Sequence, residues 1–245
     1  MVAGLGTITP DRVVIAATVH SGAVLTDVEE ISSRLVRADA EKRLNLEEYS
    51  VVRKYVLRNS RMNHDAVLTV KFNFQKGKGK WFEVVDSQGA EGMSRRVLER
   101  VIEAEVEAAT PGRQENSRLT PDHYDFTLVG MESLRGRPCY VLALHPKMKS
   151  KYLLVGKAWI DAHDFAPVRV EGWSAASMSF FVGKAYIVQD FVKVGDFYMA
   201  SYNQSKADSR LLGKSDLTIE YSDYEMKTIQ GDRVAARGSL GTGSN

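Results

Sequence analysis

The stretch Gly136–Gly172, GRPCYVLALHPKMKSKYLLVGKAWIDAHDFAPVRVEG, decides the fold class. Its hydrophobic pattern predicts three strands in a meander, at Cys139–Leu144, Tyr152–Asp161 and Pro167–Gly172. In the second and third segments, neighbouring side chains alternate between two faces, as they do in a pleated strand. The first segment is apolar at successive positions, so both of its faces are expected to be covered. The meander therefore predicts an antiparallel sheet.

The rest of the chain extends this sheet and adds two helices. Amphipathic helices are predicted over Asp27–Arg43, with Thr26 and Glu29 as a capping box, and over Ser94–Ala109. Further strands are predicted at Glu48–Arg58, His64–Gln75, Trp81–Val85, Asp122–Gly130, Phe180–Val194, Phe197–Ser205, Arg210–Gly213 and Leu217–Tyr224. The fold class is therefore α+β, with strands in the majority.

The meander also carries a resemblance to a known family. The residues that carry it are Gly136, Cys139, Tyr140, Leu142, Leu144, Pro146 and Lys147, then Gly156, Trp159, Ile160, Asp161, Pro167, Arg169, Glu171 and Gly172. They resemble the LolA-like family of bacterial envelope proteins, which includes outer-membrane lipoprotein-sorting proteins, RseB-like sensor domains and mycobacterial lipid-carrying lipoproteins. The likeness extends loosely over Glu47–Tyr224. It implies a curved antiparallel sheet forming an unclosed β-barrel, covered by two or more amphipathic helices.

The same resemblance implies an apolar cavity between sheet and helices, and hence binding of lipid or of lipoprotein acyl chains. Each buried methylene contributes about 0.8 kcal/mol, so a carrier of this kind needs volume and an opening lid, with no catalytic group. Alternation along the strands and the second helix indicates which side chains would line the cavity. These are Leu68, Val70, Phe72, Phe74, Phe82, Val84, Val97, Val101, Ile102, Tyr140, Leu142, Leu144, Ile160 and Val170. A register error of one residue would exchange the two faces of a strand.

Composition excludes several other classes. A net charge of +2 over 245 residues gives no broad basic field, so nucleic acid is not a predicted partner. The single cysteine, Cys139, rules out an intrachain disulfide and a cysteine-rich zinc site, and its place on a strand predicts a buried small side chain. No apolar run approaches the roughly 18–20 residues of a membrane span. No cofactor is predicted.

Catalytic motifs are weak. The five histidines are dispersed, without the spacing that places two on one helix face, and no Gly-x-Ser-x-Gly is present. The run Asp161-Ala-His163-Asp164 could supply an acid–base pair or a metal ligand, but these residue types are also ordinary in the turn predicted there. The basic link Lys147–Lys151 either contacts phosphate headgroups or an acidic partner, or is a solvated hairpin link. We therefore predict a protein that is not an enzyme.

The domain plan predicted from the sequence has three parts. Residues 1–25 are an N-terminal segment, a degenerate or truncated targeting region, because the apolar core Val13–Val19 is short and Asp11 stands where a basic flank belongs. Residues 26–230 form one LolA-like domain, and residues 231–245 form a flexible tail rich in Gly and Ser. The periplasmic location is implied only by the resemblance.

An alternative function of another class fits the same resemblance. In RseB-like sensors the domain detects a ligand and its output is a contact with an envelope protein partner. A second domain or a membrane anchor would favour this alternative, and the sequence shows neither.

Overall fold

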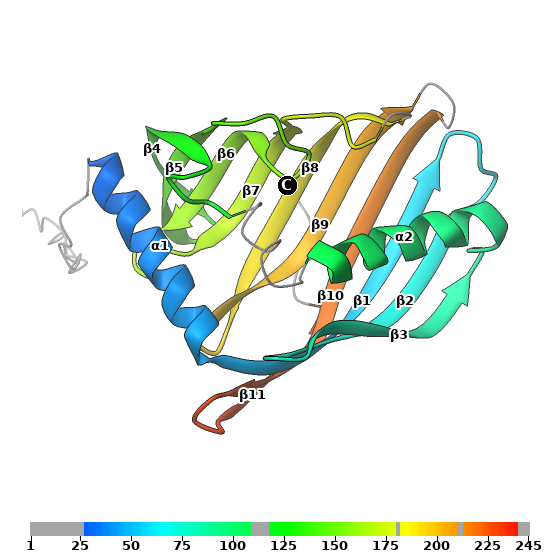
Figure 1. The fold of residues 1–245 in the computed structure, drawn as a ribbon, viewed down its shortest axis with the longest axis horizontal. Coiled ribbons are helices and arrows are strands. Elements are labelled where there is room, and N and C mark those ends of the chain that lie inside the picture. Colours follow the sequence, from blue (N-terminus) through cyan, green and yellow to red (C-terminus); the bar gives the residue numbers. More distant parts are fainter. Residues whose placement is uncertain (1–26, 109–117, 180–181, 210–212, 240–245) are drawn as a thin grey trace, which may run out of the picture.

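The fold is an eleven-stranded antiparallel sheet that curves around two helices on one of its sides (Figure 1). The computed structural model describes residues 27–108, 118–179, 182–209 and 213–239. The strands follow the order β3-β2-β1-β10-β9-β8-β7-β6-β5-β4, and β11 pairs with β10 beside the end of β9. Within the described residues β3 and β4 stand at opposite ends of this order, so the barrel is unclosed. The predicted fold class is confirmed.

The elements lie close to their predicted positions. The helices are α1 (Val28–Asn45) and α2 (Gly92–Ala108). The strands are β1 (Leu46–Asn59), β2 (Ala66–Gln75), β3 (Gly79–Gln88), β4 (Tyr124–Leu134), β5 (Arg137–Pro146), β6 (Leu154–Asp161), β7 (Pro167–Ser174), β8 (Val182–Val194), β9 (Phe197–Ser209), β10 (Gly213–Thr228) and β11 (Arg233–Ser239). The predicted meander is β5–β7, and its pairing is antiparallel throughout.

Both faces of β5 are covered, as its run of apolar residues predicts. Leu142 belongs to the apolar cluster under α1, whereas Val141 and Cys139 belong to a small cluster on the opposite face with Trp159 and Val168. Cys139 is fully buried, and this burial raises the pKa of its thiol to about 11. The thiol is therefore protonated at neutral pH and is a packing group, as predicted.

Several boundaries differ from the predictions. The N-cap of α1 is Asp27, whose carboxylate accepts a hydrogen bond from the Glu29 N–H at 2.9 Å, so the capping residue lies one position after the predicted Thr26. The segment 231–245, predicted to be a flexible tail, contributes β11, because its residues 233–239 complete the edge of β10 that β9 leaves unpaired. The targeting segment 1–25 and the strand predicted at Arg210–Gly213, up to residue 212, lie outside the described residues.

Candidate functional site

Helices α1 and α2 lie over different parts of the sheet (Figure 1). The helix side of the sheet carries two separate apolar clusters, one with side chains of α2 and one with side chains of α1. The first, here called the α2 cluster, contains buried side chains of β1, β2, β10 and α2, among them Tyr55, Phe72 and Leu98, and also Val194 and Phe197 at the turn from β8 to β9. The second, the α1 cluster, contains buried side chains of α1 and of β4–β7, among them Ile31, Leu35 and Leu142. The sheet therefore has one helix over each half and the strands β8 and β9 between them.

The structure places eleven of the fourteen predicted cavity residues in or against these two clusters. Leu68, Val70, Phe72 and Ile102 are buried in the α2 cluster, with Phe82 and Val97 half-buried against it. Tyr140, Leu142, Leu144, Ile160 and Val170 are buried in the α1 cluster. Phe74 is half-buried and stacks on Tyr49, with the ring centroids 5.3 Å apart. Eleven of the predicted residues thus belong to two packed clusters on the same side of the sheet.

Two of the predicted residues are exposed, although Val84 pairs with the buried Val70 and so lies on the helix side of the sheet. Val84 is 42% exposed, because the second half of β3 extends along the free edge of the sheet. Val101 is 36% exposed on α2, although the helix was predicted to turn Val97, Val101 and Ile102 toward the sheet. Leu98 and Ile102, four residues apart, form the buried stripe instead, and Val101 lies beside it.

Between the two clusters lies a strip of half-buried residues that the sequence did not single out, here called the central strip. Its apolar members Ile187 and Phe191 pack against the α1 cluster, while Met199 and Leu217 pack against the α2 cluster. Asn203 pairs with Ile219 on one side and with Gln189 on the other, so these two half-buried amides lie on the same face. The apolar side chains of the central strip are half-buried and lie between the two clusters.

Helix α2 is held on the sheet by a buried cation. Arg53 on β1 is buried beneath the helix, and its guanidinium donates to the Glu105 carboxylate of α2 at 2.6 Å. The same guanidinium lies 3.7 Å from the ring centroid of Phe72, and Lys80 on β3 also reaches Glu105 at 3.3 Å. Burial opposes the charged form of Arg53, but Glu105 outweighs it and raises the pKa of the guanidinium. Helix α2 therefore contacts the sheet in two ways, through the ion pair of Glu105 and through the buried side chains of Leu98 and Ile102.

The surface of the described residues also has hollows. One of about 580 Å³ lies at the end of the sheet where β1 meets β2 and β9 meets β10, and lysines and aspartates line much of it. Two further hollows are about 450 Å³, beside β11, and about 350 Å³, between α1 and the turn from β8 to β9. Of the predicted cavity residues, only Phe74 borders any of these three.

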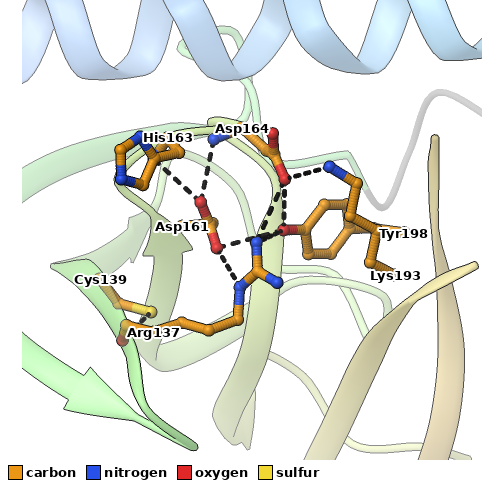
Figure 2. Close-up of polar contacts among 7 residues, drawn as sticks. All are labelled: Arg137, Cys139, Asp161, His163, Asp164, Lys193 and Tyr198. Atoms are coloured by element: carbon orange, nitrogen blue, oxygen red, sulfur yellow. Dashed lines mark hydrogen bonds and ion pairs between the residues drawn. The ribbon is translucent and has the colours of Figure 1, made fainter. Parts of the chain in front are cut away.

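A polar cluster lies around the turn from β6 to β7, at the end of the sheet opposite the hollow of about 580 Å³ (Figure 2). The buried Asp161 carboxylate accepts from the backbone N–H groups of His163 and Asp164, both at 2.9 Å, and from Arg137 Nε at 2.5 Å. The Tyr198 hydroxyl accepts from Arg137 at 2.7 Å and lies 2.7 Å from Asp164 Oδ2. This is the turn predicted for Asp161–Asp164, and its carboxylates are engaged by cations and backbone.

The ionisation of this cluster follows from those contacts. Burial would raise the pKa of Asp161, but the hydrogen bonds from Arg137 and from the two backbone N–H groups lower it below its usual range. Burial and the hydrogen bond to Asp164 raise the pKa of Tyr198, so its hydroxyl remains protonated. Neither group is placed to exchange a proton near neutral pH. The cluster therefore holds the turn from β6 to β7 in place.

We expect the Asp161 carboxylate to make stability depend on acid pH. Its pKa is lower in the folded than in the unfolded chain, so its contribution is complete above the unfolded value near 4 and is lost as pH falls through the folded value. Asp161→Asn should lower the free energy of unfolding at pH 7 by about 1–3 kcal/mol and flatten its decline between about pH 5 and pH 2. Urea unfolding across this range measures both effects. Asp125→Asn, at an exposed ion pair with Lys147, is the control; an equal loss in both variants would contradict the assignment.

Among residues 27–108, 118–179, 182–209 and 213–239, no group of three or more His, Cys, Asp and Glu side chains is placed to hold a metal ion. No helix among them is long and apolar enough to cross a membrane.

Comparison with known proteins finds one matching family model and several solved structures of similar fold. A family model whose description reads "-like: Uncharacterized protein" matches residues 115–234, and no curated protein matches the sequence. The chain is similar to a DUF1329 family protein from Desulfovibrio piger (13% identity, 80% of this chain and 92% of that chain, TM-score 0.39). It is also similar to a putative outer membrane lipoprotein-sorting protein domain from Vibrio parahaemolyticus (12%, 80% and 93%, 0.40) and a LolA superfamily protein from Nitrosomonas europaea (13%, 79% and 92%, 0.39). At these identities and TM-scores the likenesses carry nothing about ligands, so function rests on the residues of this chain.

Proposed function

We propose that this protein binds the acyl chains of a lipid or lipoprotein on the helix side of its sheet, and that it acts as a carrier and not as an enzyme. The observation that supports the proposal is the central strip. Two amphipathic helices cover the two halves of the sheet, and half-buried apolar side chains lie between the clusters under them. An acyl chain lying along β8 and β9 would cover Ile187, Phe191, Met199 and Leu217 together.

The energetics favour such a ligand. Burial of each methylene contributes about 0.8 kcal/mol, so even half of a sixteen-carbon chain supplies on the order of 6 kcal/mol before ordering costs. The two amides of the strip, Gln189 and Asn203, restrict the ligand to a path along the apolar side chains, since an unpaired buried amide is costly. A place in the bacterial cell envelope, outside the cytoplasm, is part of the proposal, on the ground of the sequence resemblance.

The test uses a fluorescent fatty acid as the acyl-chain probe. Ile187→Trp fills the central strip, so we expect it to weaken probe binding about tenfold or more, because a bulky ring excludes several methylenes of the ligand. Val188→Trp is the matched control: it is the next residue of β8 and its side chain points to the other face. Fluorescence titration gives the affinities, and mass spectrometry of gently purified protein shows whether lipid co-purifies. Absence of probe binding and of co-purified lipid in the parent protein would refute the proposal.

A further inference from the structure

Four of the large apolar side chains that are most exposed gather at one end of the sheet. Met148 is 55% exposed, Tyr152 46%, Val155 48% and Trp173 52%. They lie on the link between β5 and β6 and on the adjoining ends of β6 and β7, which an antiparallel sheet brings to the same end. Together with Lys147, Lys149, Lys151, Lys184 and Lys206 they form what is here called the rim patch.

Pairing between strands places part of the rim patch in one row on the outer face of the sheet. Val155 pairs with Trp173, Trp173 with Tyr186, and Tyr186 with Lys206. The rings of Trp173 and Tyr186 meet edge to face, with centroids 5.4 Å apart. Ala158 and Val170, three residues away along their strands, are buried in the α1 cluster, so this row faces away from the helices. Its apolar members therefore have no role in the two cores.

The charges beside this row are mostly positive. Three lysines alternate through Lys147–Lys151, and of these Lys147 pairs with Asp125 at 3.4 Å. The Lys151 ammonium lies 5.1 Å from the ring centroid of Tyr152, so cation and exposed ring form one unit. Acidic side chains are present as well: Glu171 pairs with Lys157 across β6 and β7, and Asp216 lies 3.9 Å from Lys206. The excess of positive charge is therefore concentrated on the link between β5 and β6.

We propose that the rim patch docks the protein on an anionic lipid bilayer. Tryptophan and tyrosine are enriched where bilayer meets water, and lysines there reach the phosphates with their apolar stems against the acyl region. Lysine is depleted at protein–protein interfaces, so this combination of exposed rings and lysines favours a lipid surface over a protein partner. The inference does not depend on acyl-chain binding, because the row from Val155 to Lys206 lies on the opposite face of the sheet from the central strip and the rest of the rim patch lies at the end of the sheet.

Vesicle sedimentation of the full chain tests the proposal. We expect binding to vesicles of phosphatidylcholine and phosphatidylglycerol in a two-to-one ratio, weakening as salt rises, and little binding to phosphatidylcholine alone. Lys149→Gln with Lys151→Gln should reduce binding about tenfold or more, since each lysine near an anionic surface contributes about 1 kcal/mol. Lys54→Gln with Lys71→Gln removes the same charge from exposed positions in the middle of β1 and β2, and should have little effect.

A second measurement tests the apolar part. Tyr152→Ser with Trp173→Ser should weaken vesicle binding about tenfold, whereas Ile229→Ser, at an equally exposed residue at the opposite end of the sheet, should not. Brominated lipids should quench the tryptophan fluorescence of the parent, and should quench that of Trp173→Phe much less. This result would place the Trp173 ring at the bilayer. Because Trp173 is exposed, the substitution leaves the core unchanged. Affinity for the fatty-acid probe should stay the same in all rim variants, so failure here is distinguishable from failure of the proposed function. Equal vesicle binding by rim and control variants, or none by the parent, would overturn the proposal.

Discussion

Replacing Gly156 by alanine is expected to lower the free energy of unfolding by about 3 kcal/mol or more, the upper end of what overpacking costs. Gly156 on β6 pairs with Gly172 on β7, and a Cβ built on Gly156 would collide with the carbonyl oxygen of Glu171 and lie 2.6 Å from the Cα of Gly172. All of these are backbone atoms, which cannot swing aside as a side chain does. The two strands would have to separate in the middle of the meander.

Gly183→Ala is the matched control for this prediction. Gly183 also lies on a strand, β8, but a Cβ built there would meet only the Asp208 carbonyl oxygen at 3.4 Å, an ordinary contact. We expect a change within about 0.5 kcal/mol, or a slight gain, because alanine restricts the unfolded chain more than glycine does. Guanidinium unfolding of both variants gives the comparison. A parent-like midpoint for Gly156→Ala would mean that β6 and β7 move apart at little cost.

Glu105→Ala is expected to have an effect of the same size on α2. The substitution leaves the Arg53 guanidinium buried between Phe72 and the helix without its carboxylate, and an unpaired buried charge costs about 3–5 kcal/mol. We expect the lower end of that range, since the Glu105 side chain is 36% exposed and water can reach part of the vacated site. Urea unfolding measures the loss, and hydrogen exchange should show faster exchange in α2 than in the parent.

The double variant Arg53→Met with Glu105→Leu tests whether the ion pair between Arg53 and Glu105 causes this loss, or only the packing of their side chains. An apolar pair of similar volume removes the buried charge and both of its partners, so stability should return to within about 1 kcal/mol of the parent. Arg53→Met alone should cost less than Glu105→Ala, because Glu105 keeps Lys80 at 3.3 Å and some contact with water. If the double variant lost the sum of the free energies that the two single variants lose, the role of the ion pair would be contradicted.

Much of the fold follows from local pattern. Alternation along Ala66–Phe74 and through the meander predicts strands whose buried faces are those observed, and the apolar positions of Asp27–Arg43 predict the buried Ile31 and Leu35 of α1. These features depend only on the period of each element. The family resemblance supplied the unclosed curvature, which no single strand encodes.

The candidate site was harder to predict, because it depends on which distant strands lie side by side. The single predicted cavity is two clusters, since β8 and β9 stand between the strands that carry Phe72 and those that carry Leu142. Arg53 shares a strand face with Val51 and Tyr55, and a charge in such a run is the one signal that could have revealed the contact with α2. The position of Val101 was missed because a helix of this pattern can rotate about its axis by part of a turn at little cost.

The pairing of β1 with β10 has a consequence for how the chain acquires its structure. Tyr55 pairs with Ile219, so strands from the two ends of the described chain meet side by side in the interior of the sheet. Contacts between such distant segments form slowly, because a very long loop must close before they are made. While the chain is synthesised, β1–β3 and β4–β8 can each form hairpins, but the first group cannot join the sheet until β10 has emerged. Throughout that interval β1 has an open edge, so the nascent chain is most prone to aggregation there, and a chaperone that covers extended apolar segments would act on it at this stage.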